Sequence, residues 1–475
     1  MPTGLQHLLN VGGESLGNSR LGIEITGHNI SNAQTPGFSR QRPDMEPNNP
    51  IGYGNIILGQ GAKVARVARA HNEYLEEALR RETQNHGKAE SFEHNMSRLQ
   101  GYFNPDLTST VRTRMDSFMN SLRDFANMPE EPAARINLLE TANSFTASIN
   151  LAHSNVVGLQ NDISQELGVD CEVATQKLRE IAGLNREILA LQMGDNTRPH
   201  DLEDKRDLAL AELSNLMDVQ MYKDDRGLYT VRGAGGQLLV EGIFNAEIRL
   251  EYSSKGDQPQ VVCTDFANTK ANFITDKIVG GKIAGMITVR DKYSQTVRNN
   301  LNEIAHKFGS KFNEIHRMGF GRAEFSESNG RNFFEGIDNP ELEPAQQITV
   351  ATLIRQDTNS IASAMTPKTP GDNVVINELL RITSEPMFSN GSATTSMFYD
   401  NFVASIGSAT MTAKNELKAS AVVKANVQTQ KEQISGVSLD EEAANMLKYQ
   451  HLFTASSKII TTVDEMFKTV LDLKR

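Results

Sequence analysis

The sequence predicts a mainly α-helical protein (α+β) in which a small β domain is inserted into a long helical bundle. Three observations predict this fold. Apolar heptad repeats lie at both ends of the chain, helical spacing of apolar residues continues through most of the interior, and short β-rich runs cluster once, after Val219. A chain of 475 residues is also too long for one compact core, so we expect several domains.

The first element is an amphipathic helix near the N-terminus. Large apolar residues recur every seven positions, at Leu9, Leu16, Ile23 and Ile30. Small residues follow three positions after each of them, at Gly12, Ser19, Thr26 and Ala33. This is the spacing of a coiled-coil seam, and its small positions would let a bulky partner helix approach closely.

A second heptad helix lies at the C-terminus. Its large apolar positions are Leu439, Met446, Phe453, Ile460 and Phe467. Their companions three residues later are Glu442, Tyr449, Ser456, Val463 and Val470. Most such stripes belong to ordinary bundle helices, but terminal segments fray unless something holds them. We therefore interpret the large residues of both rows as an assembly interface.

Between these ends the sequence predicts long helices. Apolar spacing indicates helices over about 68–127 and 132–194, and another one after Pro199. In the last of these, Asp201 and Glu203 occupy the first turn, where carboxylates suit the helix dipole.

The period changes in the middle of the chain. Residues 229–231, 237–240 and 246–250 are β-rich runs separated by glycine-rich turns, which is typical of hairpins. Helical spacing returns over 283–315 and over about 397–433.

We expect three domains built from distant segments. The terminal coiled-coil domain comprises residues 1–66 and 437–475. The helical shaft comprises residues 67–220, 275–318 and 387–436. The small β-rich inserted domain comprises residues 221–274 and 319–386.

Composition excludes several classes of function. The net charge of -11 and the absence of any Lys/Arg-rich run predict that the chain binds neither nucleic acid nor an anionic membrane surface. No apolar run approaches the ~18 residues that span a bilayer, and the N-terminus has no features of a cleaved signal peptide. Cys171 and Cys263 form no CxxC pair, which excludes a zinc knuckle.

We predict no catalytic residue, no cofactor, no metal site and no enzyme activity. Residues 13–17 match the G-x-S-x-G pattern of serine hydrolases, but Leu16 belongs to the heptad helix and no strand precedes it. Asp201, Asp204 and Asp207 share one helix side with basic residues between them. This pattern is typical of a solvated or salt-bridged face.

The segment after the first helix, residues 27–41, reads GHNISNAQTPGFSRQ. Its Thr-Pro-Gly turn ends the helix, and the chain leaves it extended. This segment resembles the signature of the flagellar rod, hook and hook-associated protein family, at Asn29, Asn32, Thr35, Pro36, Gly37, Arg40 and Gln41. Residues 436–445, GVSLDEEAAN, are similar to the matching C-terminal end of the same family.

Three internal stretches make the resemblance specific to hook-associated proteins of the hook–filament junction. They are DLEDKRD at 201–207, GGKIAGM at 280–286 and NGRNFF at 329–334. Relatives of this type often carry a large outer β domain after the Phe-Phe motif, whereas only a short irregular stretch follows Phe334 here. We therefore expect the outer domain to be missing or reduced.

The resemblance implies a structural subunit of the bacterial flagellum that forms the hook–filament junction and is needed for filament assembly and motility. It implies type III export to the extracellular flagellum without a cleaved signal peptide. The implied partners are further copies in a ring-like helical layer, the hook protein, the second junction protein, flagellin, and an export chaperone on the C-terminal helix. The terminal coiled-coil helices would be paired in the assembly.

Two other interpretations stay open. Another flagellar axial protein, a hook or rod subunit, would share the terminal signatures but usually lacks a long helical middle such as 68–194. A secreted coiled-coil effector would explain the amphipathic ends but not the segment 27–41.

Overall fold

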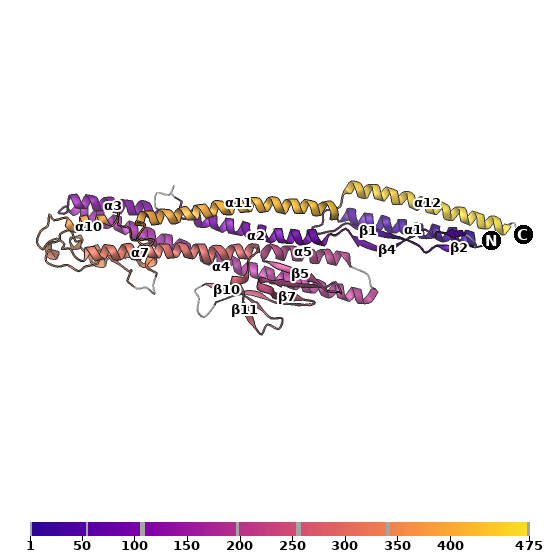
Figure 1. The fold of residues 1–475 in the computed structure, drawn as a ribbon, viewed down its shortest axis with the longest axis horizontal. Coiled ribbons are helices and arrows are strands. Elements are labelled where there is room, and N and C mark those ends of the chain that lie inside the picture. Colours follow the sequence, from indigo (N-terminus) through magenta and orange to yellow (C-terminus); the bar gives the residue numbers. More distant parts are fainter. Residues whose placement is uncertain are drawn as a thin grey trace.

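A computed structural model describes residues 2–53, 56–104, 110–195, 199–252, 258–338 and 343–472. The protein is a long rod with both termini at one end, a shaft of long helices, and a group of strands on one side of its middle (Figure 1). The prediction of a mainly helical fold with inserted β structure is confirmed.

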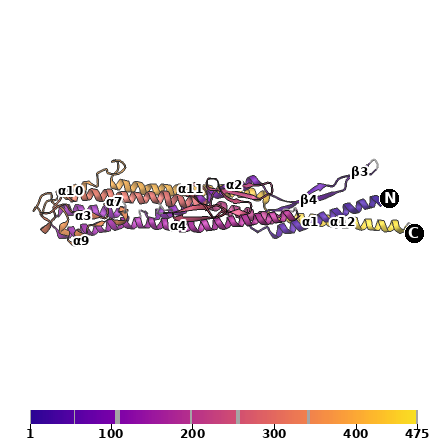
Figure 2. The same ribbon diagram turned by 90° about the horizontal axis from the view of Figure 1, so that it is seen from below.

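The two terminal helices lie side by side in both views (Figures 1 and 2). They are α1 (Pro2–Ser31) and α12 (Leu439–Asp472). Contacts join Asn29 to Glu442 and Ser15 to Ser456, so residue numbers fall along α1 as they rise along α12 and the helices are antiparallel. The expected pair is therefore already formed within one chain.

A long β-hairpin accompanies α1. Strands β1 (Gln41–Pro47) and β4 (Ala62–Arg69) pair antiparallel, and β2 (Ile51–Tyr53) pairs with β3 (Ile56–Leu58) towards the tip. The sequence analysis expected only extended chain here. The hairpin was missed because β1, QRPDMEP, contains two prolines and no apolar alternation, and prolines normally argue against a strand.

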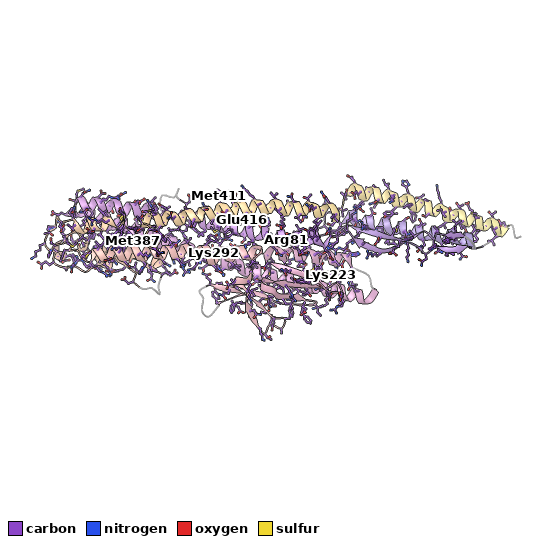
Figure 3. The ribbon with its side chains drawn as sticks, viewed as in Figure 1. Arg81, Lys223, Lys292, Met387, Met411 and Glu416 are labelled. Atoms are coloured by element: carbon purple, nitrogen blue, oxygen red, sulfur yellow. The ribbon has the colours of Figure 1, made fainter. Side chains whose placement is uncertain are left out.

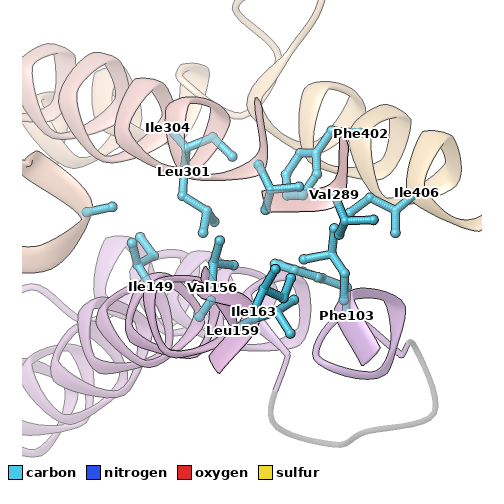
Figure 4. Close-up of a cluster of buried hydrophobic side chains, with 14 of the residues drawn as sticks. Phe103, Ile149, Val156, Leu159, Ile163, Val289, Leu301, Ile304, Phe402 and Ile406 are labelled. Atoms are coloured by element: carbon cyan, nitrogen blue, oxygen red, sulfur yellow. The ribbon is translucent and has the colours of Figure 1, made fainter. Parts of the chain in front are cut away.

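Eight helical segments make up the shaft. They are α2 (Glu73–Gly101), α3 (Val111–Asn127), α4 (Pro132–Asp195), α5 (His200–Leu216), α6 (Gly281–Ile287), a π-helical turn (Thr288–Ser294), α7 (Gln295–His316) and α11 (Thr395–Ser435). Their facing sides share one apolar core, part of which is drawn in Figure 4. There Val156 and Ile163 of α4 face Leu301 of α7 and Phe402 of α11. This continuous core holds the shaft together.

The β-rich unit consists of two small antiparallel sheets beside α4 and α5 (Figure 1). One sheet has the order β5-β6-β7-β8 and the other β11-β10-β9. The strands are β5 (Val219–Lys223), β6 (Tyr229–Gly233), β7 (Gln237–Glu241), β8 (Phe244–Asn245), β9 (Ile248–Tyr252), β10 (Pro259–Thr264) and β11 (Ala271–Phe273). The predicted β-rich runs 229–231 and 237–240 are thus strands, and the run 246–250 is a strand from Ile248 onwards.

The π-helical turn attaches this unit to the shaft. Its wider winding leaves the carbonyl oxygen of Arg290 available to the Gln160 Nε2 donor of α4, at 3.0 Å. The buried Arg290 guanidinium donates to the Pro259 carbonyl of β10, at 2.8 Å. Arg290 thereby contacts both the shaft helix α4 and strand β10 of the β-rich unit.

We expected residues 319–386 to belong to the β-rich domain, but the contacts of their described residues are mainly with shaft helices. They contain β12 (Phe334–Glu335), α8 (Pro344–Gln347), β13 (Thr349–Val350), α9 (Thr352–Gln356) and α10 (Val374–Arg381). Asn313 of α7 accepts hydrogen bonds from the Phe333 and Phe334 amides, both at 2.8 Å, and Arg135 of α4 donates to the Ile361 carbonyl. These contacts place the segment at the shaft end far from the termini, where α10 is seen in Figure 1.

His316, the last residue of α7, is a buried link to this segment. Its Nδ1 lies 2.9 Å from the Arg331 carbonyl oxygen, and its Nε2 accepts a hydrogen bond from the Ala362 amide at 2.9 Å. This pattern requires a neutral ring that is protonated on Nδ1. Burial lowers the pKa of His316 to about 4, and the positive charges of Arg331 and Arg135 act in the same direction.

We expect acid to destabilise the shaft through His316. Between pH 6.5 and about 4 the unfolded chain binds a proton here that the folded chain does not. Stability through this group is therefore constant above that window and falls as pH decreases through it, by roughly 3 kcal/mol in total. Urea unfolding of wild type and His316→Asn checks this, because their difference in stability should shrink on acidification. An equal difference at pH 7 and pH 4.5 would contradict it.

Candidate assembly interface

The seam between α1 and α12 is formed by the small and polar heptad positions. The buried members are Gly12, Ser19 and Thr26 on α1 and Glu442, Ser456 and Val463 on α12. Across the seam, the Ser456 hydroxyl donates to Ser15 Oγ at 2.7 Å. The contact is therefore closer and more polar than that of a leucine-rich coiled coil.

Two glycines let the helices come this close. A Cβ on Gly22 would lie 2.6 Å from the Tyr449 ring, and one on Gly12 would lie 3.1 Å from Ile460 Cγ1. A gap under 3 Å leaves no room for a side chain. Gly12 of the small row thus permits the close approach that the sequence analysis expected, and Gly22, which lies outside that row, permits a second one.

We expect Gly22→Ala to separate the helix pair. The added methyl group pushes against Tyr449 and should destabilise the terminal unit by about 1–3 kcal/mol, despite the better helix propensity of Ala. Gly17→Ala is the matched control, because nothing lies within 4 Å of a Cβ there. It should stabilise α1 by roughly 0.5–1 kcal/mol. Thermal melts followed by circular dichroism compare the two, and equal stabilisation by both would disprove the close contact.

The large heptad residues flank the seam and remain partly open. Leu9 is 38% exposed, Leu439 54% and Phe453 36%. The partly buried members are Leu16, Ile23, Ile30, Met446, Ile460 and Phe467. Within the described parts of α1 and α12, the only buried large apolar side chains are Ile25 and Val463, at 7% and 2% exposed. The structure brings both rows to one helix pair without covering them.

Further apolar side chains are exposed around this pair. On α12 they are Leu447, Leu452, Ile459, Met466, Val470 and Leu471, and on the hairpin Met45, Ile51, Ile57 and Leu58. Similar exposure continues on α11, where Met411 is 61% exposed (Figure 3). So much exposed apolar surface around so small a core is typical of a protein interaction site.

The signature residue Asn29 ties the end of α1 to the hairpin and to α12. Its side chain donates to the Gln41 carbonyl at 2.8 Å and accepts from the Gln41 amide at 2.9 Å. The same Nδ2 group donates to Glu442 Oε2 at 3.0 Å. A buried amide that is satisfied in this way fixes the local geometry.

Arg40 closes the same corner. Its amide donates to the Ser435 carbonyl, at the end of α11, at 2.9 Å. Its guanidinium lies 2.7 Å from both Glu441 and Glu442, and Glu442 is almost fully buried. Arg40 therefore binds the place where α11 stops and α12 begins.

The rest of the signature forms the turn between Asn29 and Arg40. The Thr35 amide donates to the Asn32 carbonyl at 2.9 Å, while Thr35, Pro36 and Gly37 are exposed. Gly37 has φ +79, a conformation that favours glycine. These residues shape the turn and do not line the seam.

A buried ionic cluster lies beside this corner. Arg69, the last residue of β4, lies 3.3 Å from Glu203, 2.6 Å from Asp204 and 2.6 Å from Asp207, all on α5. Asp204 also accepts a hydrogen bond from the Ser39 amide at 2.9 Å. The first turns of α5 thus hold both ends of the hairpin segment.

The surroundings shift the pKa values in this cluster. Burial raises the pKa of Asp204. Although burial opposes it, hydrogen bonds from His200 and Arg69 lower the pKa of Glu203 to about 2. The hydrogen bond with Glu203 raises the pKa of His200. Burial also opposes the charged form of Arg69, but Asp207 and Asp204 together raise its pKa.

Sequence reasoning missed Arg69 and Glu203 as parts of the site. Asp201, Asp204 and Asp207 were interpreted as a solvated or salt-bridged face; Asp201 is exposed, whereas Asp204 is buried and ion-paired. The one available signal was the density of acids at the start of α5. Nothing local pointed to Arg69, because it lies 134 residues before Glu203.

The described residues include no group of three or more His, Cys, Asp or Glu side chains that could hold a metal ion. Ser15 of the G-x-S-x-G match lies inside α1. Burial raises the pKa of Cys171 to about 12 and of Cys263 to about 11. Within the same part of the chain, no helix is long and apolar enough to cross a membrane.

Comparison with protein families gives two matches. Residues 96–334 match the helical domain of the flagellar hook-associated protein FlgK. Residues 429–473 match the C-terminal region of the flagellar basal body rod proteins FlgEFG. The second match covers α12 and the end of α11.

Individual relatives extend the likeness over almost the whole chain. Flagellar hook-associated protein 1 of Escherichia coli is 22% identical and covers 99% of this chain and 100% of its own. That of Bacillus subtilis is 24% identical and covers 95% and 94%. The flagellar hook junction protein FlgK from Burkholderia pseudomallei has a similar fold, with a TM-score of 0.68 and 14% identity, over 77% of this chain and 100% of that chain.

Proposed function

Because this chain belongs to the flagellar hook-associated protein FlgK family, we propose that it is a structural subunit of the hook–filament junction. It is needed there for filament assembly and motility. The match over 96–334 favours a junction subunit over a hook or rod protein, and the rod-type match at 429–473 favours an axial subunit over a secreted effector.

The observation that carries this proposal is the incomplete core of the terminal unit. Among the described residues of this helix pair, Ile25 and Val463 are the only buried large apolar side chains, so the pair obtains little stability from its own apolar contacts. Its rows of large heptad residues need a further surface. In the proposed layer, neighbouring copies supply that surface, with Leu9, Leu16, Ile23 and Ile30 of α1 and Leu439, Met446, Phe453, Ile460 and Phe467 of α12.

The partners follow from the same surface. Copies of this chain would form a ring-like helical layer between the hook protein on one side and the second junction protein and flagellin on the other. Before assembly, an export chaperone would cover the exposed side of α12, where Leu447 is 58% exposed. Export would use the flagellar type III route, without a cleaved signal peptide, and the protein would act outside the cell without enzyme activity.

We also propose a revised domain division. Residues 1–66 and 437–475 remain the terminal domain, and 221–274 remain the β-rich insert, but 319–386 belong with the shaft that they contact. The alignment to the Escherichia coli relative spans 551 positions against 475 residues here, so that relative has residues without counterparts in this chain. This supports a missing or reduced outer domain.

The function is tested by gene deletion in the source bacterium. We expect cells with hooks but without filaments, and flagellin released into the medium. A plasmid copy should restore filaments, and a copy that ends before α12 should not. Normal filaments in the deletion strain would refute the proposal.

A further inference from the structure

The first turns of α5 are where three parts of the molecule meet. Asp204 holds the Ser39 amide just before the hairpin, and Arg69 at the hairpin's end contacts Glu203, Asp204 and Asp207. Both ends of the hairpin segment are therefore fixed to one shaft helix. The terminal helix α1 is attached through this segment, because Asn29 bonds to the Gln41 backbone.

The same turns also contact the β-rich unit. Tyr229 of β6 donates its hydroxyl proton to Asp207 Oδ1, at 2.5 Å. The Arg206 guanidinium lies 3.5 Å from the centre of the Tyr229 ring and donates to Asn185 Oδ1 at 2.8 Å. Asp207 thus binds Arg69 on one carboxylate oxygen and Tyr229 on the other.

This cluster is suited to fix geometry. The side chains of Arg69, Glu203 and Asp204 are 9%, 9% and 6% exposed. A buried ion pair adds little net stability compared with an apolar contact, but its partners must meet in one arrangement. The planar fork of Arg makes that arrangement more specific than an ammonium group could.

The angle at this joint has a large effect at the far end of α12. That helix has 34 residues. It is therefore about 50 Å long, and a tilt of about 10° moves its end by roughly 9 Å. A displacement of this size would take the large heptad residues out of register with a neighbouring copy.

We propose that Arg69 is a positioning residue that sets the angle between the terminal helix pair and the shaft, with the α5 carboxylates as its latch. Neighbouring copies in the junction layer recognise that angle. Only this last step rests on the proposed function, because the angle is a property of the single chain. This proposal assigns segment 201–207 the role of holding Arg69, a segment to which the proposed function gives no other role.

The angle is measured as a distance in the purified full chain. Spin labels on Ala425→Cys in α11 and Ala455→Cys in α12 report it by pulsed electron paramagnetic resonance, since both positions are exposed and both native cysteines are fully buried. Arg69→Met should shift and broaden the distance distribution. Arg66→Met is the matched control, because Arg66 lies on the same strand, is 68% exposed and pairs only within the hairpin, with Asp44.

In cells, Arg69→Met should reduce the number of filaments roughly tenfold, since one lost buried contact can change an equilibrium by that factor or more. Arg69→Lys, which keeps the charge but not the fork, should restore part of both readouts. If Arg69→Met does not fold, Arg69→Lys is measured in its place. If Arg69→Met folds and shows the wild-type distance distribution, the latch is ruled out. If Arg69→Met does not fold, a wild-type distribution in Arg69→Lys rules it out instead.

The two parts of the proposal can fail separately. A changed distance with normal filaments would rule out recognition of the angle by neighbouring copies. If the wild-type gene itself proves unnecessary for filaments, the proposed function fails, and the distance measurement still decides the role of Arg69.

Discussion

Phe453→Asp is expected to abolish filament growth while leaving the single chain folded. Phe453 lies at the centre of the large heptad row of α12 and is 36% exposed, so a carboxylate at this position still reaches solvent in the single chain. In the proposed layer a neighbour covers it. A neighbour can bury only the exposed third of the side chain, so loss of that burial removes roughly 0.5–1 kcal/mol per contact. An unpaired carboxylate in an apolar interface costs several kcal/mol more, and this is the larger effect.

The matched control is Thr454→Asp. It adds the same charge to the next residue of α12, which is exposed and lies outside both heptad rows. We expect normal filaments and a normal thermal melt for this control. Secreted protein must be quantified for both variants, because a chaperone could bind the same side of α12. Phe453→Asp cells with normal filaments would show that this row is not the assembly interface.

Phe118→Ala, by contrast, should destabilise the shaft without altering the assembly surface. Phe118 is fully buried. Its ring stacks on that of Phe145, with 5.8 Å between the ring centroids, and the Phe312 ring centroid lies 5.6 Å away. Truncation to Ala leaves a cavity and should lower the free energy of unfolding by about 3–5 kcal/mol. Urea unfolding measures this loss.

Phe118→Leu provides the control, because it fills most of the same volume and should cost much less. Hydrogen exchange of α12 should be the same in both variants, since α3 and α12 lie at opposite ends of the rod (Figure 1). A loss below about 1 kcal/mol in Phe118→Ala would mean that the core repacks easily around the missing ring.

Local patterns in the sequence were enough to predict the long helices and three of the strands, β6, β7 and β9. Helix 132–194 was visible from its spacing and is present as α4, and the runs at 229–231 and 237–240 are present as β6 and β7. Such elements are determined by residues a few positions apart, whose periodicity shows which face is apolar. The signature at 27–41 likewise predicted the end of α1 and its turn.

Contacts between distant segments were decided only in the tertiary structure. The buried pairs of Arg69 with Glu203 and of Arg40 with Glu442 join residues 134 and 402 positions apart, and no pattern in the sequence indicates which residue pairs with which. The placement of 319–386 depends on contacts of the same kind, because shaft residues such as Asn313 and Arg135 bind that segment's backbone.

The structure of the terminal unit depends on both the local sequence pattern and the tertiary contacts. The sequence by itself determined which heptad residues are large and which are small. Only the tertiary structure decided how these rows face the partner helix. Gly12 of the small row and Gly22 outside it allow Ile460 and Tyr449 to approach, whereas the large residues Leu9, Leu439 and Phe453 stay exposed. The physical reason is that heptad spacing defines a stripe, whereas the side of the stripe that is buried depends on the shape of the surface it meets.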